Sequence, residues 1–250
     1  MSFHSNDSAC RDISNEEVEA RAHTLLQDYT AWGDSEIEVP VPVEVIAEQY
    51  LGYEIDITDE GLFQNPDYLG GIVFDEKVIR VNTSVEAHEG RYNFTIAHEI
   101  GHHVLHLEQD VEGASNQNSR TLCLETGEKL PIEKQANLFA ASLLMPGDFV
   151  RAAYARIEEG SLPSSNPTTS AVRALAARVV EMGGFTNVSN TAMVNRLIDL
   201  RLVSGARYQT GTPWDYLKLP EPAHRFLSKS LRRTLFRWMR SLGFTNRKRK

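Results

Sequence analysis

The sequence predicts an α+β fold, and three observations support this prediction. Apolar residues recur at helical spacing in several segments. Two short segments rich in β-branched residues, 70–74 and 78–82, are separated by only three residues, as in a β-hairpin. A histidine-rich segment, 95–106, has the apolar spacing of a helix that buries one side. A chain of 250 residues is long enough to bury a sizeable core around these elements.

The N-terminal part of the chain is predicted to be largely helical. Ser14 or Asn15 can cap a first helix, in which apolar side chains recur every three or four residues. Pro40 and Pro42 introduce a second helix, which ends near Gly52. The predicted elements are a helix at 15–29, a loop at 32–38, a helix at 43–50 and a strand at 53–57.

Three residues of the histidine-rich segment form the pattern His-Glu-x-x-His, namely His98, Glu99 and His102. Helix positions four apart lie on the same face, so both imidazoles can bind one metal ion. Two neutral histidine nitrogens can hold zinc and leave coordination positions open, while the adjacent carboxylate can accept a proton from water at the metal. The motif therefore predicts zinc-dependent hydrolysis of an amide, with Glu99 as the general base.

The alternative interpretation of this motif is a histidine-rich helix that holds no metal, because the pattern is short. A helix is supported by its neighbours, since the apolar residues around the motif recur at spacings of three, four and seven. A carboxylate farther along the chain favours the metal site over the alternative.

Glu133 is the predicted third metal ligand. Zinc hydrolases commonly supply three protein ligands and leave the fourth position to water. Pro131 opens a helix that runs to about residue 145, and Glu133 lies in its first turn. This carboxylate can reach the metal if its helix packs against the histidine-rich helix; otherwise it only favours the helix dipole. The weaker candidates, which lie in or beside predicted turns, are Glu125, Glu128 and Asp148.

The predicted hairpin is a candidate for substrate binding. Gly70 and Gly71 lie where it begins, and they suggest a β-bulge or a close approach of another backbone. In metallopeptidases an edge strand beside the metal helix commonly pairs with the extended substrate. We therefore expect this hairpin either to supply that edge strand or to be purely structural.

A hydrolytic site also needs a donor to the developing oxyanion. The sequence offers Tyr68, Arg80, Tyr92 and His103 and does not distinguish among them. His103 follows the second histidine of the motif by about 100° around the helix, so it should point away from the metal. His106 lies one turn after that histidine and could support it, but an exposed or packing role is favoured.

The rest of the folded chain is predicted to hold a loop, a short strand and further helices. Residues 108–120 are polar and typical of a loop, and a strand follows at 120–124. Two helices, 171–182 and 189–202, resemble a helix-turn-helix. Because the second of them lacks a dense basic face, we favour packing against the core over DNA binding.

Charge is unevenly distributed along the chain. From Arg225 to Lys250 there are ten Lys or Arg residues and no acid, whereas the other 224 residues carry 16 basic and 34 acidic side chains, a net charge of −18. The tail is amphipathic, so it could bind an anionic membrane, nucleic acid or a partner, or fold back onto the acidic body. Folding back is favoured, and contact with nucleic acid or membrane is not.

The expected location is the cytoplasm. No apolar segment approaches the roughly 20 residues that a membrane span needs, and the N-terminus lacks the basic and apolar regions of a secretion signal. Cys10 and Cys123 are the two cysteines, too few for a disulfide framework and consistent with a reducing compartment.

Two blocks of the chain, YNFTIAHEIGHHVLH and IEKQANLFAASLLMP, resemble the ImmA/IrrE family of metallo-endopeptidases, the M78 peptidases. The segments GGIVFDEKVIRVN, PVPVEVIAEQYLG and VSNTAMVNRLIDLRLV match as well, so the resemblance covers about residues 14–203 and ends before the tail. It implies that His98, His102 and Glu133 bind Zn²⁺ and that Glu99 activates the water. It also implies a zincin-like, thermolysin-like core with a small sheet beside the metal helix.

The same resemblance implies a biological role. Characterised members of the family act in bacteria and their mobile elements as site-specific proteases. They cleave a helix-turn-helix repressor and thereby derepress genes of the stress response or of element excision. The protein substrate expected here is such a repressor, and no composition or spacing in the chain identifies it.

The sequence is therefore interpreted as a cytoplasmic zinc metallo-endopeptidase with a helical C-terminal extension. The alternative is a DNA- or partner-binding regulator that uses the metallopeptidase fold as a scaffold. The sequence does not predict the oligomeric state. The expected segments are a flexible N-terminus at 1–14, a zinc metallopeptidase domain at 15–160, a helix-turn-helix-like segment at 161–205 and a basic amphipathic tail at 206–250.

Overall fold

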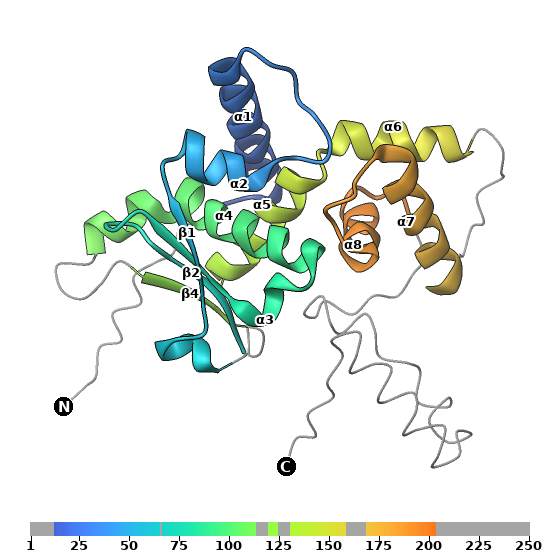
Figure 1. The fold of residues 1–250 in the computed structure, drawn as a ribbon. Coiled ribbons are helices and arrows are strands. Elements are labelled where there is room, and N and C mark those ends of the chain that lie inside the picture. Colours follow the sequence, from blue (N-terminus) through green and yellow to red (C-terminus); the bar gives the residue numbers. More distant parts are fainter. Residues whose placement is uncertain (1–12, 66, 114–119, 125–130, 159–168, 204–250) are drawn as a thin grey trace, which may run out of the picture. The chain divides into compact units, whose positions relative to one another are not determined.

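The computed structural model describes residues 13–65, 67–113, 120–124, 131–158 and 169–203 (Figure 1). These residues belong to one compact unit that extends to residue 206, and a second unit, 207–250, lies outside the described residues. The predictions for the first twelve residues, for the basic tail and for two of the weaker ligand candidates, Glu125 and Glu128, also fall outside them.

The described residues alternate between helices and strands of a single small sheet, which confirms the predicted α+β class. In chain order the elements are α1 (Asn15–Gly33), α2 (Val43–Val45), the π-helix η1 (Ile46–Tyr50), β1 (Glu54–Thr58), the 3-10 helix η2 (Gly61–Gln64), β2 (Tyr68–Val73), β3 (Val78–Asn82), α3 (Thr83–Glu86), α4 (Glu89–Gly113), β4 (Arg120–Leu124), α5 (Pro131–Leu144), α6 (Gly147–Glu158), α7 (Thr169–Gly183) and α8 (Asn190–Asp199).

The sheet has four strands in the order β1-β3-β2-β4. The strands β2 and β3 form the predicted antiparallel hairpin, β4 pairs antiparallel with β2, and β1 pairs parallel with β3. Helix α4 packs against β2 and β3 and also against α5. It thus lies between the sheet and α5 (Figure 1). Most of its residues from Thr95 to His106 are buried.

The prediction that the hairpin supplies the edge strand is wrong. Both of its strands have a neighbour on each side, and the edges of the sheet are β1 and β4. The physical reason lies in the hairpin's composition, because Ile72, Ile79 and Val81 are completely buried and such β-branched strands suit the interior of a sheet. The predicted strand at 120–124 is confirmed, and it is this strand that flanks the hairpin on the side of β2.

Helix α1 is longer than predicted, since it continues through the first part of the expected loop at 32–38. It is capped at its start by Ser14, whose Oγ accepts a hydrogen bond from the backbone N–H of Glu17. At its far end the ring of Trp32 packs on Tyr29 and Tyr50, with centroid separations of 6.2 and 5.8 Å. A contact with a residue 18 positions away therefore extends the helix.

Two other helical boundaries differ from the predictions. Helix α4 extends beyond the histidine-rich segment to Gly113 and occupies the first part of the expected loop at 108–120. Helix α6 was not predicted, because the preceding Pro146-Gly147 pair is typical of a break. Its buried residues Val150, Ala153 and Ile157 nevertheless recur at helical spacing, so the apolar periodicity of the sequence was enough to predict this helix.

The helices α7 and α8 pack on the rest of the unit, as expected. The guanidinium of Arg196 on α8 is almost completely buried. It donates to the carbonyl of Met145 at 3.0 Å and to the carboxylate of Glu19 at 2.6 Å. The side-chain amide of Asn187, in the turn between the two helices, donates to the carbonyl of Val41 at 2.9 Å. The face of α8 that carries Arg196 therefore packs against the core.

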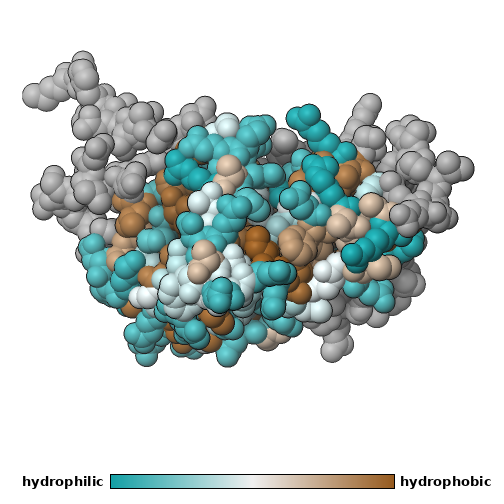
Figure 2. Space-filling view, turned by 90° about the horizontal axis from the view of Figure 1, so that it is seen from above, coloured by the Kyte–Doolittle hydropathy of each residue, from teal (hydrophilic) through white to brown (hydrophobic). Residues whose placement is uncertain are grey.

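None of the helices in the described part of the chain is both long and apolar enough to cross a bilayer. Figure 2 shows hydrophobic residues interspersed with hydrophilic ones on the face in view.

The close packing of α4 on α5 depends on Gly101. A Cβ atom at this position would lie 3.2 Å from the Cα and carbonyl oxygen of Ala136 and from the Cβ of Phe139. Because backbone atoms cannot move aside as a flexible side chain can, we expect Gly101→Ala to lower the free energy of unfolding by about 1–2 kcal/mol despite the higher helix propensity of alanine.

Urea denaturation of the Gly101→Ala protein measures this effect. Gly33→Ala is the matched control, because a Cβ at Gly33, also in a helix, would meet only the Ser35 hydroxyl at 3.4 Å. Equal unfolding free energies for the two variants would show that the helices do not need a glycine at this contact.

Candidate metal centre

Helix α4 carries three of the predicted site residues into the interior. His98, Glu99 and His102 are each at most 1% exposed. The apolar residues Ile96 and Ile100, which alternate with them along the helix, are fully buried as well. This burial follows from the position of α4 between the sheet and α5. His98 and His102 point in the same direction because residues four apart on a helix lie on one face.

In the structure the predicted third ligand, Glu133, lies beside the two histidines. The Nε2 atoms of His98 and His102 are 3.0 Å apart. The carboxylate oxygens of Glu133, from the first turn of α5, lie 3.3 Å from His98 Nε2 and 3.2 Å from His102 Nε2. One ligand atom from each residue lies within 4.8 Å of the others, and this is the one such group found in the described residues. Asp148, in the first turn of α6, does not belong to it.

The protonation states of these groups suit a cation. Burial lowers the pKa of His102 to about 4, so its imidazole is neutral at pH 7. Burial by itself would raise the pKa of Glu133, but its contacts with the imidazoles of His102 and His98 outweigh burial and hold that pKa well below its usual range. Two imidazoles and one ionised carboxylate form a donor set that fits a divalent metal ion.

Glu99 provides a second test of this fit. It is completely buried, and burial is the main reason that its pKa is raised to about 8. Neither of its carboxyl oxygens has a hydrogen-bond partner among the described residues. A buried carboxyl group without partners is costly to the fold. Its position beside three converging ligand atoms therefore fits a group that acts on a bound cation and its substrate.

The strand β2 meets α4 at Gly70, as the glycine pair suggested. A Cβ atom on Gly70 would lie 2.4 Å from Thr95 Cγ2 and 3.1 Å from Glu99 Oε1. The register between β2 and β4 also shifts between Tyr68 and Gly70, which confirms the expected irregularity. The sheet therefore touches the metal helix directly beside the candidate general base, and only glycine leaves room for this contact.

The expectation that His106 has an exposed or packing role is wrong. The residue is buried, and its Nδ1 lies 3.0 Å from Nδ1 of His102. Its Nε2 lies 2.9 Å from the side-chain oxygen of Gln135 on α5. Sequence reasoning missed Gln135, because the contact joins positions 29 residues apart on two helices. The spacing of four residues between His98, His102 and His106 was the sequence feature that could have indicated a contact between His106 and His102.

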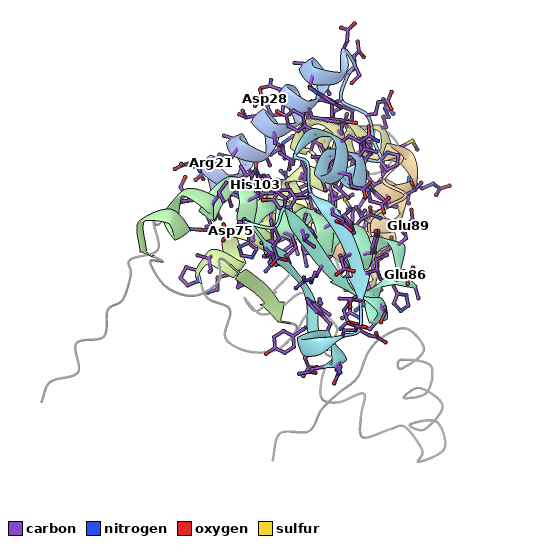
Figure 3. All side chains as sticks on the ribbon, turned by 60° about the vertical axis from the view of Figure 1, so that its left-hand side comes forward. Arg21, Asp28, Asp75, Glu86, Glu89 and His103 are labelled. Atoms are coloured by element: carbon purple, nitrogen blue, oxygen red, sulfur yellow. The ribbon has the colours of Figure 1, made fainter. Side chains whose placement is uncertain are left out.

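Three of the four candidate oxyanion donors are engaged elsewhere. The hydroxyl of Tyr92 donates to Glu44 on α2 at 2.7 Å. Arg80 forms ion pairs at 3.4 Å with two acidic residues, Asp56 and Glu76. His103, labelled in Figure 3, lies 3.0 Å from the hydroxyl of Tyr53 through its Nδ1, and burial lowers its pKa to about 4. His103 is thus turned toward Tyr53, the residue just before β1, in agreement with the predicted angle.

Comparison with known families identifies the segment that contains this site. Residues 53–163 match the model of the M78 peptidases, which is described as the IrrE N-terminal-like domain. The match includes the sheet, α4 and α5, and therefore all four predicted site residues. No curated protein matches the chain.

The contact between Gly70 and α4 can be tested by substitution on both sides. We expect Gly70→Ala to lower the free energy of unfolding, because its methyl group would overlap Thr95 Cγ2. Thr95→Ser removes that methyl and keeps the hydroxyl that donates to the carbonyl of Arg91.

A double-mutant cycle, with unfolding free energies measured by urea denaturation, shows whether Thr95→Ser removes the steric overlap that Gly70→Ala creates. We expect the variant with both substitutions to be more stable than the sum of the single effects predicts, by about 1 kcal/mol or more. Additive effects would mean that the two residues do not limit the approach of the strand to the helix.

Proposed function

Because the chain carries a domain of the M78 peptidase family at residues 53–163, we propose that it is a zinc-dependent endopeptidase with a zincin-like core. The observation that supports this proposal most directly is the convergence of His98, His102 and Glu133 within 4.8 Å of one another, with the unpartnered carboxyl group of Glu99 beside them. A packing cluster would not need a buried carboxyl group without hydrogen bonds.

The proposed cofactor is Zn²⁺, held by His98, His102 and Glu133. A set of two imidazoles and one carboxylate is a common donor set of catalytic zinc sites and leaves one position for water or substrate. When bound, zinc supplies Lewis acidity toward a peptide carbonyl and a water molecule. The low pKa of His102 and the ionised state of Glu133 mean that neither must lose a proton at pH 7 for metal to bind.

The proposed role of Glu99 is general base and then general acid. Its carboxylate would accept a proton from the attacking water as the new carbon–oxygen bond forms, and would then pass that proton to the amide nitrogen as the carbon–nitrogen bond breaks. Burial favours the neutral form of Glu99, whereas a cation beside it favours the charged form. The same buried position thus gives the carboxyl group a proton affinity that is useful in both steps.

The strand β4 is the proposed docking site for the substrate backbone. It is an edge of the sheet, and no strand of the described residues pairs with its outer side. An extended peptide can add to such an edge through main-chain hydrogen bonds. The proposed substrate remains a cytoplasmic helix-turn-helix repressor, which rests on the family resemblance alone.

The first experiment measures metal content and cleavage together. We expect nearly one zinc ion per chain in the wild type and in Asp148→Ala, the matched carboxylate control, and a loss of zinc in His98→Ala and Glu133→Ala. The cleavage substrate is the repressor encoded beside the gene. Wild-type protein that stays free of zinc after zinc has been supplied would remove the basis of the proposal.

The Glu99→Gln variant separates catalysis from metal binding. We expect it to keep its zinc and to lose cleavage by a factor of about 10²–10⁴, because the amide cannot accept the proton. The competing proposal, a DNA- or partner-binding regulator that only retains the fold, requires the reverse, namely that Glu99→Gln keeps full biological function.

Tyr68 is the proposed oxyanion donor. It begins β2, two residues before the glycine that contacts Glu99, and the other three candidates have the partners described above. We expect Tyr68→Phe to lower kcat by about 10²-fold while KM and zinc content stay near the wild-type values. An unchanged kcat would rule out this assignment; Tyr92→Phe, which removes only the bond to Glu44, is the control.

A further inference from the structure

A buried row of polar side chains extends from the candidate metal site across the contact between α4 and α5. It comprises His102, His106 and Gln135, with successive atom pairs separated by 3.0 and 2.9 Å. All three side chains are less than a tenth exposed. Gln135 lies two positions after Glu133 on α5, so the row and the candidate ligand tie the same two helices together.

The identity of the atoms sets the direction of these hydrogen bonds. The Gln135 atom that faces His106 is the amide oxygen, which can only accept. His106 must therefore donate from Nε2, and when its ring carries this one proton, its Nδ1 is an acceptor. The proton shared by the two Nδ1 atoms then belongs to His102. That leaves a lone pair on His102 Nε2, the atom that faces His98 and Glu133.

We propose that His106 and Gln135 are positioning residues that hold His102 in the tautomer with Nδ1 protonated and Nε2 directed at the metal. This inference rests on the proposed function. A histidine ligand commonly donates its second ring N–H to another group, which fixes the orientation of the ring. Here that group is a second histidine, which in turn contacts the neutral amide of Gln135.

The arrangement has a consequence for how the site is assembled. The two residues that position His102 come from different helices, since His106 lies on α4 and Gln135, which contacts His106, lies on α5. The orientation of a ligand on one helix thus depends on the packing of the other. A change at Gln135, which is linked to His102 through His106, is then expected to weaken zinc binding through two successive hydrogen bonds.

The test uses the full chain and four variants. Gln135→Met removes the acceptor at similar volume, and His106→Phe removes both ring nitrogens. Gln135→Glu keeps an acceptor oxygen at the same place and serves as the conservative rescue. Ser142→Ala, at another buried polar position on α5 whose hydroxyl has no partner among the described residues, controls for changes to the helix itself.

Two readouts are measured for each protein: the zinc dissociation constant by competition with a chelator, and the tautomer of His102 in the metal-free protein by ¹⁵N NMR of the imidazoles. We expect Gln135→Met and His106→Phe to weaken zinc binding by about 10–100-fold. We also expect them to lose the Nδ1-protonated form as the dominant tautomer. Gln135→Glu and Ser142→Ala should keep both properties within a few-fold of the wild type.

The inference is overturned if zinc affinity and tautomer are unchanged in both Gln135→Met and His106→Phe. It is also overturned if wild-type His102 carries its proton on Nε2. Failure of the proposed function gives a different result: the wild type itself would bind no zinc. The NMR measurement on metal-free protein would still report the tautomer of His102. A variant that does not fold is replaced by the other, since each interrupts the row at a different residue.

Discussion

The contact between α4 and α5 is the constraint on which the site depends. The two histidines lie on one helix and Glu133 on the other, so the ligand atoms meet only if the helix axes approach closely. Gly101 permits this approach because its Cα lies against the backbone of Ala136. The apolar side chains around it then fill the interface without separating the helices.

The sheet contributes to the site from the opposite side of α4. The absence of a side chain at Gly70 lets β2 touch the helix beside Glu99. The carboxyl group is completely buried, and this burial is the main cause of its raised pKa. Burial and chemistry are therefore linked, because the packing that stabilises the fold also sets the proton affinity of the proposed general base.

Local patterns made part of this structure predictable. Ser14 and Ser189 cap their helices through their own side chains, and the hairpin follows from two β-branched segments with a short connection. The convergence of His98 and His102 was also predictable, because their spacing is a property of one helix. The position of Glu133 in a first turn needed only one further assumption, that the helices pack together.

The features that could not be predicted depend on contacts between distant segments. Which strand lies at an edge is decided by the parallel addition of β1 and the pairing of β4, and no local pattern encodes either. The end of α1 depends on rings that meet across 18 residues. The partner of His106 is on another helix, so a histidine whose spacing fitted the site could not be distinguished from one that merely packs.

The supply of ligands by two helices has a kinetic consequence. A metal ion bound at the proposed site would crosslink α4 and the first turn of α5, two segments that are separated by 31 positions in the chain. Loss of the ion would then be coupled to a local opening in which that turn separates from α4. The rate at which metal is lost to an excess of chelator would then measure how often this one turn opens, in a protein that is otherwise fully folded.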